Sequence, residues 1–204
     1  MDALRGVTLD VPAGDFLAIE GPSGSGKSTL LRVMAGLWPP TSGRVVLDGH
    51  AFHELSDADL SLLRRRHIGF LHQLFNLLPD LTAVDNVALP LLLDGLGAGA
   101  AEMRAEASLA RLGVGALAKR RPEELSGGEM LRVALARALV IEPVVVLADE
   151  PTGSLDRANG QRVLDLFREI HLDGKVTLVV VTHDDEVAAA AARIVHMVDG
   201  RIES

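Results

Sequence analysis

The sequence predicts an α/β protein built on a mostly parallel sheet, and two observations lead to that class. The apolar run Phe16 to Ile19 precedes a glycine-rich loop and the helix-forming stretch Leu30 to Ala35. Later in the chain, Val144 to Ala148 and Leu178 to Val181 are apolar runs rich in β-branched residues, which are typical of buried parallel strands. The amphipathic stretch Asn159 to His171 separates these two runs, so strands and helices alternate.

The middle of the chain has a different pattern. From 75 to 139 the periodicity is mostly helical, and no internal repeat or low-complexity tail accompanies it. We therefore expect a single domain over 1–204. Its core lobe is formed by 1–74 and 140–204, and a helical subdomain at 75–139 interrupts it.

Local signals predict the remaining elements. Ser56 and Asp59 form a capping pattern ahead of a helix that reaches about Arg66, and Thr82 and Asp85 do the same for a helix that Pro90 should kink or end. The other expected elements are strands at 4–11, 44–47, 68–71 and 194–198 and helices at 98–112 and 126–139. They complete the alternation around the sheet.

The most informative motif is the loop that follows the first buried strand. It contains Gly21, Pro22, Ser23, Gly24, Ser25, Gly26, Lys27, Ser28 and Thr29, which fits the pattern Gly, four residues, Gly-Lys-Ser/Thr. Glycines let backbone N–H groups turn inward as an anion nest, Lys27 supplies a charge to the β- and γ-phosphates, and the Ser28 hydroxyl can ligate Mg²⁺. The helix beginning here adds the positive end of its dipole. The strand–loop–helix context favours a phosphate-binding loop over a glycine-rich turn that binds nothing.

Asp149 and Glu150 end the apolar run that begins at Val144. At the C-terminal edge of a parallel sheet, such acids face the ligand crevice. Asp149 fits the acid that holds Mg²⁺ through its water shell, and Glu150 can polarise a water molecule as a general base. The alternative is an acid pair that only caps the next turn. The phosphate loop in the same chain favours the catalytic interpretation.

A second glycine-rich turn precedes the long helix at 126–139. Ser126 and Glu129 satisfy the capping-box pattern, so one interpretation is simply a well-capped helix. However, Gly127 and Gly128 are poor helix formers in the first turn, which indicates that something approaches the backbone closely. A capped, glycine-rich helix start is an anion site, and this one makes best sense if it meets a nucleotide held by another subunit.

Two further polar residues follow buried strands. His183 comes just after Leu178 to Val181, a strand that we expect beside the phosphate-loop strand, so His183 is predicted to sense the γ-phosphate. Gln73 follows the strand at 68–71, at the joint between core and helical subdomain. An amide there can join the Mg²⁺ or water shell and report it to the helices.

Composition and charge limit the classes of function. The formal net charge of -8 argues against a sequence-independent nucleic-acid binder, and the absence of cysteine removes thiolate chemistry and disulfides. The longest apolar stretch, Val87 to Leu93, contains Pro90 and is too short to cross a bilayer. Part of it, Leu89 to Leu93, is either core or a docking cleft for a partner. Because this stretch is too short to cross a bilayer, we expect another polypeptide to span the membrane if the chain acts there.

Taken in order, these motifs resemble the nucleotide-binding subunit of an ATP-binding cassette (ABC) transporter, over essentially the whole chain. The matching segments are the phosphate loop, Gln73 as the Q-loop, Leu125 to Glu129 as the signature, Val144 to Glu150 as Walker B, Ser154 to Asp156 as the D-loop and His183 as the switch histidine. The stretches Ile68 to Leu91 and Asp149 to Asp156 are similar to the macrolide-exporter and lipoprotein-release group.

The resemblance implies a RecA-like P-loop NTPase core with an N-terminal antiparallel β part and an inserted helical subdomain. It also implies ATP and Mg²⁺ as ligands and a homodimer around two ATP, in which Ser126, Gly127 and Gly128 face the nucleotide of the other copy. A separate transmembrane permease would be the partner, and nucleic acid would not. The chain would then lie peripherally on the cytoplasmic face of the inner membrane.

The chain departs from the family pattern at two places. The adenine-stacking aromatic of the family falls before Met1, and Met130 stands where the family often has glutamine. These departures bear on adenine stacking and on contacts to the ribose of the partner-bound nucleotide. Two other functions are kept: a soluble ABC-type ATPase in DNA repair or translation, and a regulatory nucleotide-binding module with little turnover, which the missing adenine platform suggests. The cargo is not encoded here, because its selectivity belongs to the permease.

Overall fold

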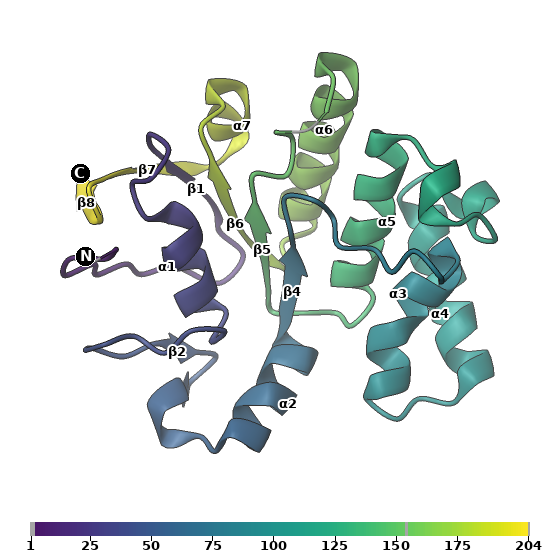
Figure 1. The fold of residues 1–204 in the computed structure, drawn as a ribbon, viewed down its shortest axis with the longest axis horizontal. Helices are drawn as coiled ribbons and strands as arrows, with labels where there is room; N and C mark the ends of the chain where they lie inside the picture. The colour runs from purple at the N-terminus through teal and green to yellow at the C-terminus, as the bar shows by residue number, and fades with distance from the viewer. Residues whose placement is uncertain (1–2, 154, 204) are drawn as a thin grey trace.

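A six-stranded sheet forms the centre of the computed structural model, which describes residues 3–153 and 155–203 (Figure 1). Its strand order is β4-β5-β6-β1-β7-β8, and all neighbours are parallel except β7 and β8. The strands are β1 (Phe16–Glu20), β4 (Ile68–Leu71), β5 (Val145–Asp149), β6 (Thr177–Thr182), β7 (Arg193–Val198) and β8 (Arg201–Glu203). The mostly parallel sheet predicted from the sequence is confirmed.

The register of the central strands brings their C-terminal ends to one edge. Ile19 of β1 and Asp149 of β5 are both paired with Val181 of β6. The segments that follow these three strands therefore begin side by side, although they are far apart in the sequence. This edge is where ligands bind in open parallel sheets.

Alternate side chains of the strands enter two hydrophobic cores, one on each face. Leu17, Ile19, Leu147 and Val179 pack with α1 (Lys27–Met34) and α2 (Asp57–His67). The intervening residues, among them Phe16, Val146 and Leu178, pack with α5 (Gly127–Leu139), α6 (Arg157–Asp173) and α7 (Asp185–Ala190). Because both faces are covered, these strands are apolar throughout rather than alternating.

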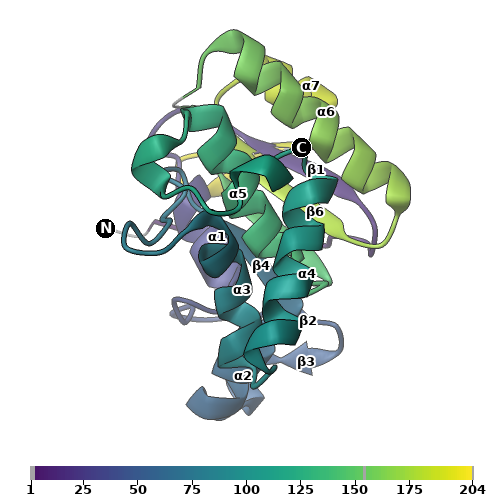
Figure 2. The ribbon, with the colours of Figure 1, turned by 90° about the vertical axis from the view of Figure 1, so that its right-hand side faces the viewer.

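Three helices, α3 (Ala83–Leu93), α4 (Ala98–Arg111) and α5, lie side by side on the right of Figure 1 and face the viewer in Figure 2. Short 3-10 turns at Gly115–Leu117 and Pro122–Glu124 connect α4 to α5. These helices share one core with the adjoining face of the sheet. The division into a core lobe and a helical subdomain at 75–139 stays a prediction. In the described part of the chain, no helix combines the length and the hydropathy that spanning a bilayer would require.

Three expected elements differ from the structure in whole or in part. The segment 4–11 is not a strand, because the described residues offer it no ladder partner. Val7, Leu9 and Val11 alternate because they pack on the core. Pro90 does not end α3, which continues to Leu93, since buried residues on both sides of the proline hold the helix by packing. The strand expected at 44–47 is confined to β2 (Val46–Leu47), which pairs with β3 (His50–Ala51) in an antiparallel hairpin.

Candidate nucleotide-binding and hydrolysis site

The loop between β1 and α1 requires glycine for reasons of space as well as conformation. Gly24 and Gly26 have φ angles of 82° and 103°, in the left-handed region. A Cβ atom on Gly26 would lie 2.5 Å from the Ala3 carbonyl oxygen, and one on Gly21 would lie 2.1 Å from that of Met197. A side chain at Gly21 or Gly26 would therefore collide with a backbone carbonyl, so both positions require glycine.

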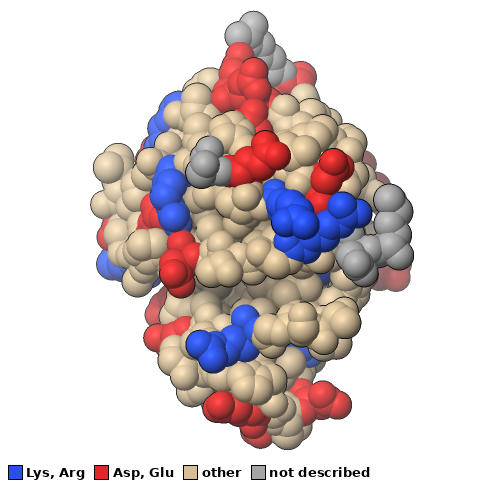
Figure 3. Space-filling view, turned by 90° about the vertical axis from the view of Figure 1, so that its left-hand side faces the viewer, with Lys and Arg blue, Asp and Glu red and all other residues tan. Residues whose placement is uncertain are grey.

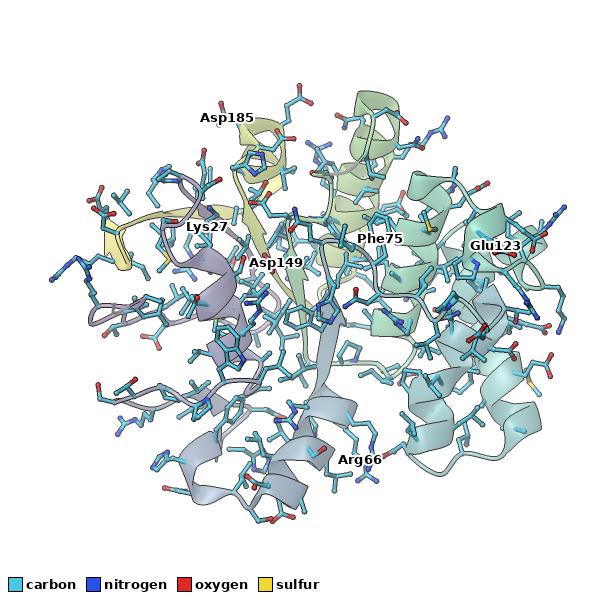
Figure 4. All side chains as sticks on the ribbon, viewed as in Figure 1. Lys27, Arg66, Phe75, Glu123, Asp149 and Asp185 are labelled. Carbon is cyan, nitrogen blue, oxygen red and sulfur yellow. The ribbon has the colours of Figure 1, made fainter. Side chains whose placement is uncertain are left out.

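Lys27 is the first residue of α1, and its ammonium group folds back over the loop. The side chain is buried, and Nζ donates to the carbonyl oxygens of Gly21 at 2.7 Å and Pro22 at 3.0 Å. Figure 4 shows Lys27 and Asp149 close together at the upper edge of the sheet. The helix start has no side-chain cap and no acid in its first turn. A positive charge and a helix N-terminus thus converge on one point, as phosphate binding requires.

Ser28 and Asp149 are in direct contact, although 121 positions separate them. The Ser28 hydroxyl donates to Oδ1 of Asp149 at 2.8 Å. Both ligands are oxygens, which suits Mg²⁺, and that ion is commonly held by one or two protein groups together with phosphates and water. The described residues contain no cluster of three His, Cys, Asp or Glu side chains able to hold a metal by themselves. The donor set fits a metal that arrives with a nucleotide.

Glu150 and His183 form a second pair beside the first. His183 Nδ1 lies 2.7 Å from Glu150 Oε2, and the Glu150 side chain is 14% exposed against 60% for His183. Glu150 has a φ of 48°, and its N–H donates to the Val181 carbonyl of the neighbouring strand. Because a carboxylate can only accept, the proton of this bond belongs to Nδ1. Sequence analysis named both residues but did not predict that they touch.

The turn at Ser126 is a capped helix start, as predicted. The Ser126 hydroxyl accepts from the Glu129 N–H, and the Glu129 carboxylate accepts from the Ser126 N–H and hydroxyl. The close approach expected at the glycines comes from the chain itself. A Cβ on Gly128 would lie 2.6 Å from Asn159 Oδ1, and one on Gly127 would lie 3.1 Å from Leu155 Cδ2. The surface of the turn is left free, since Ser126 is exposed.

The D-loop is described only in part, because Ser154 lies outside the described residues. Asp156 caps α6 by accepting from the Asn159 N–H at 3.0 Å. Asn159 Nδ2 also donates to the Asp156 carboxylate. The segment after Glu150 is thereby packed against the turn at Ser126. Sequence analysis missed Asn159, and no local pattern marks it.

Gln73 is exposed, and its side chain has no hydrogen-bond partner among the described residues, so its place in the metal shell stays a prediction. The preceding residue, His72, is partly buried. Burial, and then the positive charge of Arg137, lower the pKa of His72 below its usual 6.5, so its imidazole is neutral at pH 7. The loop after β4 therefore presents two neutral polar side chains, His72 and Gln73, and His72 is near enough to Asp149 to be influenced by its charge.

A phosphate loop, a serine–aspartate pair and a glutamate–histidine pair at one sheet edge define a nucleoside triphosphatase. Comparison with known proteins narrows the class, because residues 4–153 match the family described as ABC transporter. The chain belongs to the ABC transporter family, and it is an ATPase of the cassette class, as the order of its motifs predicted.

Relatives match over nearly the whole chain. An uncharacterized ABC transporter ATP-binding protein of Thermotoga maritima is 48% identical over 203 residues, which are 100% of this chain and 86% of the relative. The lipoprotein-releasing system ATP-binding protein LolD of Aquifex aeolicus is 46% identical over 98% of this chain and 89% of its own. A solved dimeric structure of the cassette MJ0796, in a post-hydrolysis state bound to ADP and Pi, is 41% identical with a TM-score of 0.91 and covers 99% of this chain and 89% of that one.

Proposed function

We propose that the chain is the ATP-hydrolysing subunit that drives a separate membrane permease, of the lipoprotein-release or macrolide-export type. The observation that carries the proposal is the double pair Ser28–Asp149 and Glu150–His183 next to the phosphate loop. Similarity to the LolD proteins of Aquifex aeolicus and Bordetella avium, both 46% identical, supports the type of transporter.

Each residue of the site has a step that its geometry suits. Lys27 moves from the loop carbonyls to the β- and γ-phosphates, where its charge is more strongly stabilised. Ser28 and Asp149 hold Mg²⁺, with Gln73 completing the shell; the ion, when bound, neutralises charge on the phosphate oxygens. Glu150 accepts a proton from the attacking water as general base. His183 orients that carboxylate through Nδ1–H. With both ring nitrogens protonated, it would also donate its Nε2–H to the γ-phosphate.

Two copies act together in this proposal. ATP on the phosphate loop of one copy meets Ser126, Gly127 and Gly128 of the other, so the γ-phosphate favours the closed dimer over the open one. The arrangement is isologous, and hydrolysis removes the group that bridges the copies. The dimeric structures of MJ0796 support it, since one of them holds ADP and Pi.

A groove of about 540 Å³ between α2 and β4 on one side and α3 and α5 on the other is the proposed permease contact. Leu89, Pro90 and Leu93 supply part of its apolar lining. Among the described residues, the charged side chains of the lining are Arg64, Arg65 and Arg137, and Arg65 is paired with Asp94 at 3.3 Å. A basic groove on a chain of net charge -8 fits a permease helix that has an apolar face and an acidic side chain. Docking here would place the chain on the cytoplasmic face of the inner membrane.

The alternatives are less well supported. Figure 3 shows acidic and basic side chains interspersed on the face at the left of Figure 1, without the continuous basic surface that DNA or RNA binding needs. The net charge of -8 also disfavours nucleic-acid binding, and with it a role in DNA repair or translation. A regulatory module with little turnover would not need Glu150 and His183 to be paired.

The test uses purified protein with Mg²⁺ and ATP. We expect phosphate release, retention of ATP, and an ATP-dependent dimer in sedimentation. A protein that neither retains ATP nor dimerises would overturn the nucleotide site, and one that binds without turnover would support the regulatory alternative.

Co-expression with a permease encoded beside the gene tests transport. Arg64→Glu should reduce co-purification of the two proteins, and Arg111→Glu, on the exposed face of α4, should not.

A further inference from the structure

The loop that carries Gln73 is held in an unusual conformation. Phe75 and Asn76 have φ angles of 61° and 48°, so two successive residues other than glycine are left-handed. The Phe75 N–H donates to the His72 carbonyl at 2.9 Å, which closes the loop into a tight turn. Such conformations are disfavoured for side chains with a Cβ and persist only where neighbouring groups hold them.

One arginine holds both residues. Arg137 Nη2 donates to the Phe75 carbonyl and Nη1 to the Asn76 carbonyl, each at 2.7 Å. Arg137 is half-buried, and burial lowers the pKa of its guanidinium. Among the described residues it has no ion pair with a carboxylate. A partly buried cation that binds two backbone carbonyls and no carboxylate contributes little to stability, which points to a positional role.

The helix that bears Arg137 also bears the glycine-rich turn. Arg137 lies on α5, which begins at Gly127 just after Ser126. The two points are ten residues apart, about 15 Å along the axis at roughly 1.5 Å per residue. The interior of α5 is buried against the sheet and the other helices, so we expect the helix to move as one body. A displacement of the Ser126 turn that moves α5 as a whole should therefore also move the carbonyl groups of Phe75 and Asn76, to which Arg137 donates.

We propose that Arg137 is a positioning residue that fixes Gln73 relative to α5, so that engagement of the Ser126 turn and placement of Gln73 are coupled within one chain. Figure 4 shows Phe75 on the loop between β4 and the helices, the point where this grip acts. The inference rests on the proposed function, because it takes Gln73 to belong to the metal shell.

The first test compares the variants Arg137→Gln and Arg137→Lys with Arg111→Gln, an exposed arginine of α4, as control. For Arg137→Gln we expect kcat about tenfold lower or more, a higher Mg²⁺ concentration for half-maximal rate, and little change in the KM for ATP. Amides of Phe75 and Asn76 should exchange hydrogen at least about tenfold faster. The lysine variant should recover part of the loss. Unchanged kcat, Mg²⁺ dependence and exchange would overturn the proposal.

Two variants of Asn76 separate positioning from a merely structural role. Asn76→Gly adopts the left-handed conformation easily, so it should restore part of kcat and of the Mg²⁺ response in the Arg137→Gln background. Asn76→Val disfavours that conformation and should reproduce the defect with Arg137 intact, even if Arg137→Gln folds poorly. Normal kinetics in Asn76→Val would contradict the inference. Absence of turnover in the wild type would instead count against the proposed function. The exchange rates of the Phe75 and Asn76 amides would still show whether Arg137 holds the loop.

Discussion

His183 Nδ1 lies 2.7 Å from Glu150 Oε2, although 33 positions separate the two residues. The contact exists because β5 and β6 are neighbours in register, so that each residue follows the C-terminal end of its strand. The pairing fixes the tautomer of the histidine and one rotamer of the glutamate together. The proposed base and the proposed phosphate sensor therefore form one unit, and we expect each to lose its function when the other is removed.

Replacing Glu150 by glutamine should stop turnover and keep ATP bound. Glutamine retains the shape and the contact with His183 but cannot accept the proton of the attacking water, so phosphate release should fall by about 10²–10⁴-fold. ATP should then trap the dimer, which sedimentation would detect. The matched control is Glu142→Gln, since Glu142 also has a left-handed φ, of 53°, but lies outside the site. Normal turnover in Glu150→Gln would remove Glu150 from this role.

His183→Ala should slow hydrolysis more than it weakens ATP binding. The variant releases Glu150 from its hydrogen bond, and we expect kcat to fall about 10–100-fold because the carboxylate loses its orientation. His53→Ala, at an exposed position in the 3-10 turn Phe52–Glu54, serves as control. Phosphate-release kinetics over a range of ATP concentrations distinguish the two effects. A change in KM alone would contradict the pairing.

Lys27→Ala should weaken nucleotide binding itself. The ammonium group is held at the loop by two carbonyls and is available to phosphate oxygens, so its loss should reduce ATP affinity about tenfold or more. Titration calorimetry measures the affinity directly. Lys175→Ala, an exposed lysine paired with Asp173, should bind like the wild type. Equal affinity in Lys27→Ala would contradict the assignment of the loop.

The two glycines of the Ser126 turn should respond differently to alanine. A Cβ on Gly128 meets Asn159, which Asp156 holds in place, so Gly128→Ala should lower the free energy of unfolding by about 1–3 kcal/mol. A Cβ on Gly127 meets only the end of the flexible Leu155 side chain, and Gly127→Ala should be nearly neutral. Urea unfolding compares them. Equal stability of the two variants would show that Asn159 gives way.

The capping box at Ser126 should make stability depend on acid pH. Hydrogen bonds from the Ser126 N–H, and then from its hydroxyl, lower the pKa of Glu129 below its usual 4.5. A lowered carboxyl pKa stabilises the fold above pH 4.5, and this contribution is lost as the pH falls through the folded-state value. Between pH 7 and pH 3 the free energy of unfolding should fall further in the wild type than in Glu129→Gln. The difference should be at most about 0.5 kcal/mol, because water screens the exposed pair. Urea titrations at both pH values measure it; an identical loss would exclude the linkage.

Local sequence patterns determined much of this protein. The strand at Ile68–Leu71 and the caps at Ser56, Thr82 and Ser126 are where the sequence predicted them, because each depends on residues within one turn or one strand. The phosphate loop could be recognised for the same reason, because its glycines are required by backbone geometry that a few adjacent residues define. The order of the motifs then identified the family.

Only the tertiary structure decided which of these residues meet. Register in the sheet joins Glu150 to His183, and the position of α1 against the sheet joins Ser28 to Asp149. Helix packing joins Gly128 to Asn159 and Arg137 to the loop of Gln73. It also decided that 4–11 is not a strand, because a ladder needs a second chain segment that local alternation cannot supply. Contacts between distant segments depend on how whole strands and helices align, and that alignment minimises the free energy of the entire core rather than of any one motif.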